Sequence, residues 1–244
     1  MKVVSSCLVV RCLAFTSSAA TKIWTNPTGG NWSDGANWSP NGMPGAGDAA
    51  MITNSGTYLV NLDLNATILS LTLGGMGGNQ TLSNNASTLR LSSESMVRSQ
   101  GVMVLSGGTF SGPGGVRIAP GGQMILAGQG TKTFSALQLF NQGTVRWLAG
   151  TVQADNMVPG TVVTNSGLWQ AEGNDYLYYP FGPPMARFYN NGTFRKGVSN
   201  ARLGEDATLY PKPFFRRAPR GEAQEGGACP QSLPWVAAAP GLKG

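Results

Sequence analysis

Residues 141–145 read NQGTV, and the same order of a polar pair, a glycine and the start of an apolar run returns as NSGLW at 165–169 and as NNGTF at 190–194. The glycines of these three stretches lie 24 and 25 residues apart. A related step, TNSGTY, occurs at 53–58. A unit that returns roughly every 20–30 residues, and that cannot bury its apolar face alone, is typical of a solenoid in which repeats stack on their neighbours.

The chain between these turns consists of short runs of Val, Leu, Ile, Thr and aromatic residues that alternate with small polar residues. Alternation with a period of two indicates half-buried strands, and no stretch shows a helical period. We therefore expect an all-β fold, a single-stranded right-handed parallel β-helix. Its N-terminal cap would span 21–52 and its repeats 53–197. A β-sandwich is the alternative, because it also has short strands with regularly spaced turns.

The composition fits a coil that turns sharply several times. Gly accounts for 35 and Pro for 15 of the 244 residues, while charged residues reach only 11%. Gly and Asn form positive-φ corners at low cost, and few charges are tolerated because stacked like charges repel. The chain has no histidine. This excludes Ser-His-Asp and Cys-His catalysis and every metal site that contains histidine.

Charge and cysteine usage narrow the possible partners. The net charge is +6, but the basic residues are spread along the chain without forming a stripe, so we expect no nucleic-acid partner. The cysteines are Cys7, Cys12 and Cys229, which leaves 21–198 with neither a disulfide nor a thiol metal site. An Asp-x-Asp series for calcium is also missing. We expect no cofactor and no metal.

Both ends of the chain differ from the repeats. Residues 1–20 resemble a secretory signal peptide, with Lys2, an apolar stretch and small residues up to Ala20; the alternative is a short buried strand or helix. We expect a secreted or cell-surface protein, and no apolar run is long enough to predict a transmembrane helix. Residues 198–244 lose the repeat pattern, so we expect a disordered tail, a shifted reading frame or a linker to a partner.

The stretch at 24–48 reads WTNPTGGNWSDGANWSPNGMPGAGD and contains the duplication NWS. It resembles the opening module of bacterial secreted and surface-displayed β-helix repeat proteins, similar to autotransporter and filamentous-haemagglutinin passengers. The resemblance covers about 21–197. It implies an exported solenoid that serves as a stalk or in adhesion, and it brings no catalytic residues with it.

Three tryptophans of this segment, Trp24, Trp32 and Trp38, have two interpretations. Terminal repeats of a solenoid need a plug over the open core, and a tryptophan buries a large area while its N–H finds a partner. The same rings could instead form a platform on which a surface glycan stacks.

A second candidate site combines acidic and aromatic residues. Glu172 and Asp175 stand beside Tyr176, Tyr178 and Tyr179. A glycosidase needs two carboxyl groups on either side of a groove, so this cluster is the candidate for a glycan site. The prolines and glycine that follow predict a loop wrapped over the coil edge instead.

Our leading hypothesis is a non-enzymatic, exported, adhesin-like β-solenoid module, a fragment of a larger surface protein. The alternative is a carbohydrate-binding module, or a weak polysaccharide-active β-helix enzyme, whose partner is a surface glycan or matrix polysaccharide. The sequence leaves the oligomeric state open.

Overall fold

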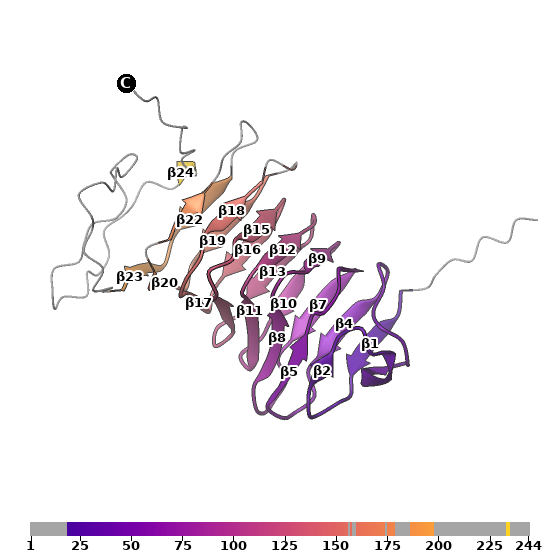
Figure 1. Ribbon diagram of the computed structural model, residues 1–244. Helices are drawn as coiled ribbons and strands as arrows, with labels where there is room; N and C mark the ends of the chain where they lie inside the picture. Colours follow the sequence, from indigo (N-terminus) through magenta and orange to yellow (C-terminus); the bar gives the residue numbers. More distant parts are fainter. Residues whose placement is uncertain are drawn as a thin grey trace, which may run out of the picture.

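The computed structural model describes residues 19–155, 157, 160–173, 175–178 and 186–197, together with the strand at 233–234. Apart from the 3-10 turn η1 (Gly35–Asn37), the regular structure of this part of the chain consists of β-strands. The strands form three sheets of ten, eight and six strands. They stack along one axis from β1 to β23 (Figure 1).

The ten-stranded sheet A has the order β24 (Leu233–Pro234), β22 (Arg187–Asn190), β19 (Val162–Asn165), β16 (Gln138–Asn141), β13 (Gly115–Ile118), β10 (Ser95–Val97), β7 (Ser70–Leu73), β4 (Ala49–Ile52), β1 (Thr21–Trp24) and β3 (Trp38–Ser39). The eight-stranded sheet B has the order β2 (Gly30–Asn31), β5 (Tyr58–Asn61), β8 (Gln80–Asn84), β11 (Gly101–Leu105), β14 (Gln123–Leu126), β17 (Thr144–Trp147), β20 (Leu168–Ala171) and β23 (Thr193–Lys196). The six-stranded sheet C has the order β21 (Leu177–Tyr178), β18 (Val152–Ala154), β15 (Lys132–Ser135), β12 (Gly108–Ser111), β9 (Thr88–Leu91) and β6 (Ala66–Ile68).

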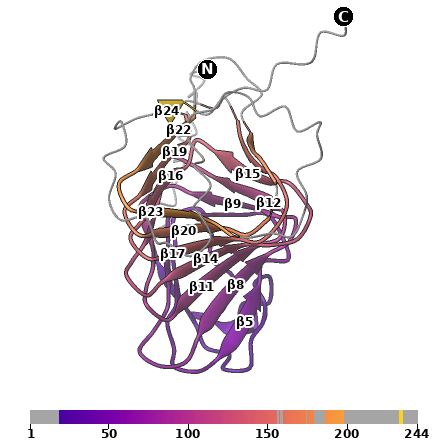
Figure 2. The same ribbon diagram turned by 90° about the vertical axis from the view of Figure 1, so that its left-hand side faces the viewer.

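From β4 to β23, successive strands along the chain belong to different sheets, and every third strand pairs in parallel with the one a coil earlier. The result is a parallel β-solenoid of about six coils, which confirms the predicted fold and not the β-sandwich alternative. Figure 2 shows sheets A, B and C surrounding a common interior. Thr144 pairs with Leu168 and Leu168 with Thr193, the 24- and 25-residue steps of the sequence pattern.

The interior is filled by the alternate residues of all three sheets. In β14, for example, Met124 and Leu126 are fully buried while Gln123 and Ile125 lie on the outer face. The core continues from the tryptophans of the first coil to Trp169 in β20. Burial on one side of each strand therefore follows the period-two pattern of the sequence.

The repeated glycines mark where one coil passes close over another. A Cβ on Gly143 would lie 2.3 Å from the carbonyl oxygen of Gly122, and a Cβ on Gly167 would lie 2.3 Å from that of Gly143. Gly192 continues the column, with 2.4 Å to the oxygen of Gly167. No other residue leaves room for this approach, because real Cβ atoms do not come so near to a backbone oxygen.

Two expectations about local structure need refinement. Residues 21–52 already contain strands of the sheets, since β1 pairs in parallel with β4, so the cap is itself the first coil. Residues 177–178, expected in a loop, form β21 because Leu177 continues the ladder above Val152 in sheet C.

The predicted leader at 1–20 lies outside the described residues up to residue 18. The predicted tail at 198–244 lies outside them apart from β24, whose Leu233 pairs antiparallel with Phe188. Within the part of the chain that the structure describes, no helix has the length and apolar character needed to cross a membrane.

Candidate functional site

The three N-terminal tryptophans form one aromatic cluster inside the first coil. Trp24 and Trp32 are fully buried, and Trp38 is 2% exposed. The Trp38 ring makes edge contacts with both others, at centroid distances of 5.1 Å to Trp24 and 4.8 Å to Trp32. Because none of these rings has a face open to solvent, a sugar cannot stack on them in this conformation.

Antiparallel pairing and indole hydrogen bonds fix this cluster. Trp38 in β3 lies opposite Trp24 in β1. The Trp24 Nε1 donates to the carbonyl of Asn26 at 2.6 Å, and the Trp38 Nε1 donates to the carbonyl of Trp32 at 3.0 Å. Trp32 Nε1 has no hydrogen-bond partner among the described residues. The arrangement covers the end of the core, as a solenoid cap must.

Carboxylates hold the loops of the same cap. The Asp48 carboxylate accepts from the backbone N–H groups of Ala20 and Gly45 at 3.1 and 2.8 Å. Asp63, in the next coil, accepts from both the N–H and the hydroxyl of Ser33. Partial burial raises the pKa of Asp63, but these hydrogen bonds outweigh it and hold the pKa below its ordinary value.

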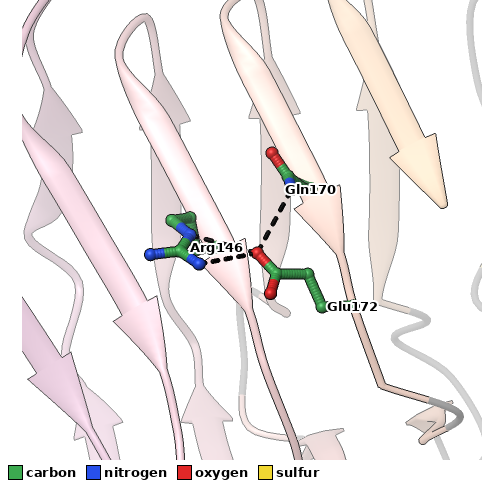
Figure 3. Close-up of polar contacts among 3 residues, drawn as sticks. All are labelled: Arg146, Gln170 and Glu172. Atoms are coloured by element: carbon green, nitrogen blue, oxygen red, sulfur yellow. Dashed lines mark hydrogen bonds and ion pairs between the residues drawn. The ribbon is translucent and has the colours of Figure 1, made fainter. Parts of the chain in front are cut away.

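In the second predicted site, Glu172 is occupied by neighbouring side chains on sheet B. Its Oε1 accepts from Nε and Nη2 of Arg146 at 3.1 and 2.9 Å and from Nε2 of Gln170 at 3.2 Å (Figure 3). Arg146 and Gln170 are register partners on β17 and β20. Glu172 therefore links two coils on the outer face, and the positive charge of Arg146 compensates the negative charge of its carboxylate.

Asp175 fastens the turn between sheets B and C. Its Oδ2 accepts from the N–H of Gly150, one coil earlier, at 2.7 Å. The negative charge of Asp175 also acts on the ammonium groups of Lys132 and Lys196. Burial lowers the pKa of both lysines, and attraction to Asp175 partly offsets this decrease. Lys196 also donates to the carbonyl of Gly173. The hydrogen bond that Asp175 accepts is thus a structural one between coils.

Lys132 was not singled out from the sequence, although it is the one charged residue that is buried among those the structure describes. It lies on the inner face of β15, in line with the buried Phe134. Its Nζ donates to the carbonyls of Gly128 and Ala149, in the turns of two adjacent coils. The period-two pattern could have revealed it, because the sequence KTFS places a lysine on the same face as a core phenylalanine.

Of the three tyrosines, Tyr176 and the backbone of Tyr178 belong to the part of the chain that the structure describes. Tyr176, directly before β21, is 69% exposed. Tyr178 belongs to β21, where its backbone pairs with Gln153. Tyr179 lies outside the described residues. The structure therefore brings Glu172, Asp175 and Tyr176 to one corner of the solenoid.

An asparagine ladder was also missed as a feature in its own right. Asn141 and Asn165 are fully buried. Asn141 Nδ2 donates to Asn165 Oδ1 at 2.6 Å, and Asn165 Nδ2 donates to Asn190 Oδ1 at 2.7 Å. These are the asparagines two residues before the recurring glycines, so the signal was present in the repeat that predicted the fold.

One cavity of about 250 Å³ lies on the outside, at the corner between sheets C and A. Its lining consists of Arg90, Gly112, Pro113, Ser135, Ala136 and Met157. This lining includes no carboxylate, whereas glycoside hydrolysis needs two. Among the described residues, no group of three or more Cys, Asp or Glu side chains could hold a metal ion.

Comparison of the chain with protein-family models, curated proteins and solved structures found no match.

Proposed function

We propose that this chain is a non-enzymatic, exported, adhesin-like structural module, a solenoid that serves as a stalk or spacer at a cell surface. The single observation that carries the proposal is the use of the carboxylates. All seven acidic residues of the coils accept hydrogen bonds within a turn or from a neighbouring coil: Asp34, Asp48, Asp63, Glu94, Asp155, Glu172 and Asp175.

A catalytic carboxylate must reach its substrate and change its protonation or bonding during the reaction. A carboxylate that ties two coils together serves stability, because its loss would leave buried or turn N–H groups unpaired. Glu172, whose carboxylate accepts three hydrogen bonds, is the clearest example. This use of acids favours a structural role over hydrolysis.

Export is tested by producing the full chain in a Gram-negative host and fractionating the cells. We expect the chain outside the cytoplasm with its leader removed, as found by N-terminal sequencing of the product. The backbone of Ala20 bonds to Asp48 and Ala49, so cleavage directly after Ala20 would remove two hydrogen bonds from the first coil. A chain that stays in the cytoplasm with Met1 intact would overturn the proposal.

The enzymatic alternative rests on the corner that holds Glu172, Asp175 and the exposed Tyr176. It is tested by incubating the full chain with pectin, alginate, xylan and chitin and measuring new reducing ends. We expect no release above that of a heat-denatured control. Turnover by the wild type that disappears in both E172Q and D175N, with the fold intact by circular dichroism, would replace our proposal with that of an enzyme.

A further inference from the structure

The outer face of sheet A carries one column of side chains in register across its later strands. Arg117 pairs with Phe140, Phe140 with Thr164, and Thr164 with Tyr189. Phe140 faces outward because both of its neighbours, Leu139 and Asn141, are buried. Tyr189 likewise alternates with Phe188, whose ring packs on the core residue Trp169 at 5.0 Å.

The Phe140 ring contacts two residues of the neighbouring strand β13, because Gly115 lies next to its Cε2 atom and the Arg117 guanidinium lies over the ring. It reaches over Gly115 on the neighbouring strand, where a Cβ would lie 3.4 Å from its Cε2. The Arg117 guanidinium lies 5.3 Å from the ring centroid. Arg117 is in turn held by Glu94, with 3.1 Å between Nε and Oε1. These contacts fix the ring before any ligand arrives, which reduces the entropic cost of binding.

Two aromatic rings in one column, separated by one strand, are spaced by two strand intervals, roughly 9.5 Å. Such a spacing is comparable with the length of a disaccharide in an extended glycan chain. Hydrogen-bonding groups lie between and beside the rings, namely Thr164 in the column and Gln138 and Arg187 two residues earlier on their strands. Aromatic faces combined with a few polar groups are what a sugar-binding surface requires.

We propose that Phe140 and Tyr189 form a binding platform for a linear neutral polysaccharide whose chain runs along the solenoid axis. The proposal deepens the adhesin-like function and rests on it for its biological setting, but the site itself is independent of export. It also relocates the glycan contact from the buried tryptophans of the cap to the outer face of sheet A.

Charge favours a neutral glycan over a single-stranded nucleic acid, which also stacks on aromatic rings. A nucleic-acid surface needs a row of unpaired basic groups along the phosphates. Here Arg117 is paired with Glu94, the single exposed Arg187 does not make a row, and Thr164 separates the two rings.

The test is affinity electrophoresis of the full chain in gels that contain mixed-linkage β-glucan, xylan or hydroxyethyl cellulose, together with pull-down on insoluble cellulose and chitin. We expect retardation by at least one of these probes. F140A and Y189A should each weaken binding about tenfold, and the double variant about a hundredfold, since each removes one stacked ring. Y189F should bind as the wild type does, because the ring is kept.

The matched control is L59A, which removes a 48% exposed apolar side chain from the outer face of sheet B. It should bind normally, and all variants should keep the wild-type circular dichroism spectrum. No binding of the wild type to any probe, or binding by F140A and Y189A as tight as that of the wild type, would overturn the platform. Binding to poly(dT) that is lost with salt, without glycan binding, would overturn it in favour of nucleic acid. A chain that is not exported but still binds through Phe140 would refute the proposed function and leave the site standing.

Discussion

Replacing Asn165 by Ala tests whether the buried asparagine ladder stabilises the later coils. The Asn165 side chain takes part in three hydrogen bonds, with Asn141 Nδ2 at 2.6 Å, Asn190 Oδ1 at 2.7 Å and the carbonyl of Thr193 at 3.1 Å. Asn141 keeps its bond to the Leu168 carbonyl, so its amide is not left wholly unpaired.

The magnitude follows from the number of bonds. A buried hydrogen bond contributes about 0.5–1.5 kcal/mol net, so the loss of three lowers the free energy of unfolding by about 3 kcal/mol. For a chain of this size, that corresponds to a fall in melting temperature of roughly 6–12 °C. Because N141A and N165A share one of these bonds, their effects should be non-additive by about 1 kcal/mol in a double-mutant cycle.

The assay is urea unfolding followed by tryptophan fluorescence, with thermal unfolding by circular dichroism beside it. N191A is the matched control, because the Asn191 side chain is exposed in the next turn. It should change stability by less than about 0.5 kcal/mol. If N165A and N191A proved equally stable, the ladder would contribute nothing, and the stability of these coils would have to come from apolar packing and backbone pairing alone.

Three further perturbations test other contacts between coils. G143A should destabilise the chain by about 3 kcal/mol in urea unfolding, since its Cβ would lie 2.3 Å from a carbonyl oxygen of the preceding coil. The control is G47A, whose Cβ would have no atom within 4 Å and which should therefore leave stability unchanged. K132M should lower the free energy of unfolding by about 3 kcal/mol, because two charge-assisted hydrogen bonds to carbonyls are lost. Only part of this free energy is regained, because an ammonium group is no longer buried. A K132M variant as stable as the wild type in the same urea titration would contradict this. The lowered pKa of Asp63 means that its contribution is present above the unfolded pKa of about 3.9 and is lost as the pH falls through the folded value. The gap in melting temperature between wild type and S33A should therefore shrink below that pH, and a gap that stays constant would show that the Ser33 hydroxyl does not act through the carboxylate.

The fold was predictable because its signals are local. Period-two alternation selects strands, and glycines 24 and 25 residues apart select a coil length. The structure adds the reason for the glycines: at Gly143 and Gly167 the backbone of the previous coil occupies the place of a side chain. The outward and inward positions of most strands also follow from alternation alone.

The candidate sites were less predictable. The sequence left two interpretations open for Trp24, Trp32 and Trp38, a cap over the core and a platform for a glycan. Only their burial and ring contacts in the structure show that the rings pack on one another. From the sequence, Glu172 and Asp175, three residues apart, form one candidate pair. In the structure each has its own partner from an earlier coil, Arg146 and Gly150 respectively.

The sequence by itself determined the strands, the turns and their stacking into a parallel solenoid, since these depend on contacts between residues that are near in the chain and on a repeat length. The tertiary structure decided which side chains meet across coils: the asparagine ladder, the contacts of Lys132, and the column that joins Phe140 to Tyr189. The physical reason is that these partners are one or two coils apart, and the register steps vary, for example 21 residues from Gln123 to Thr144 and 25 from Leu168 to Thr193. Only the hydrogen-bonded register fixes which residue lies above which.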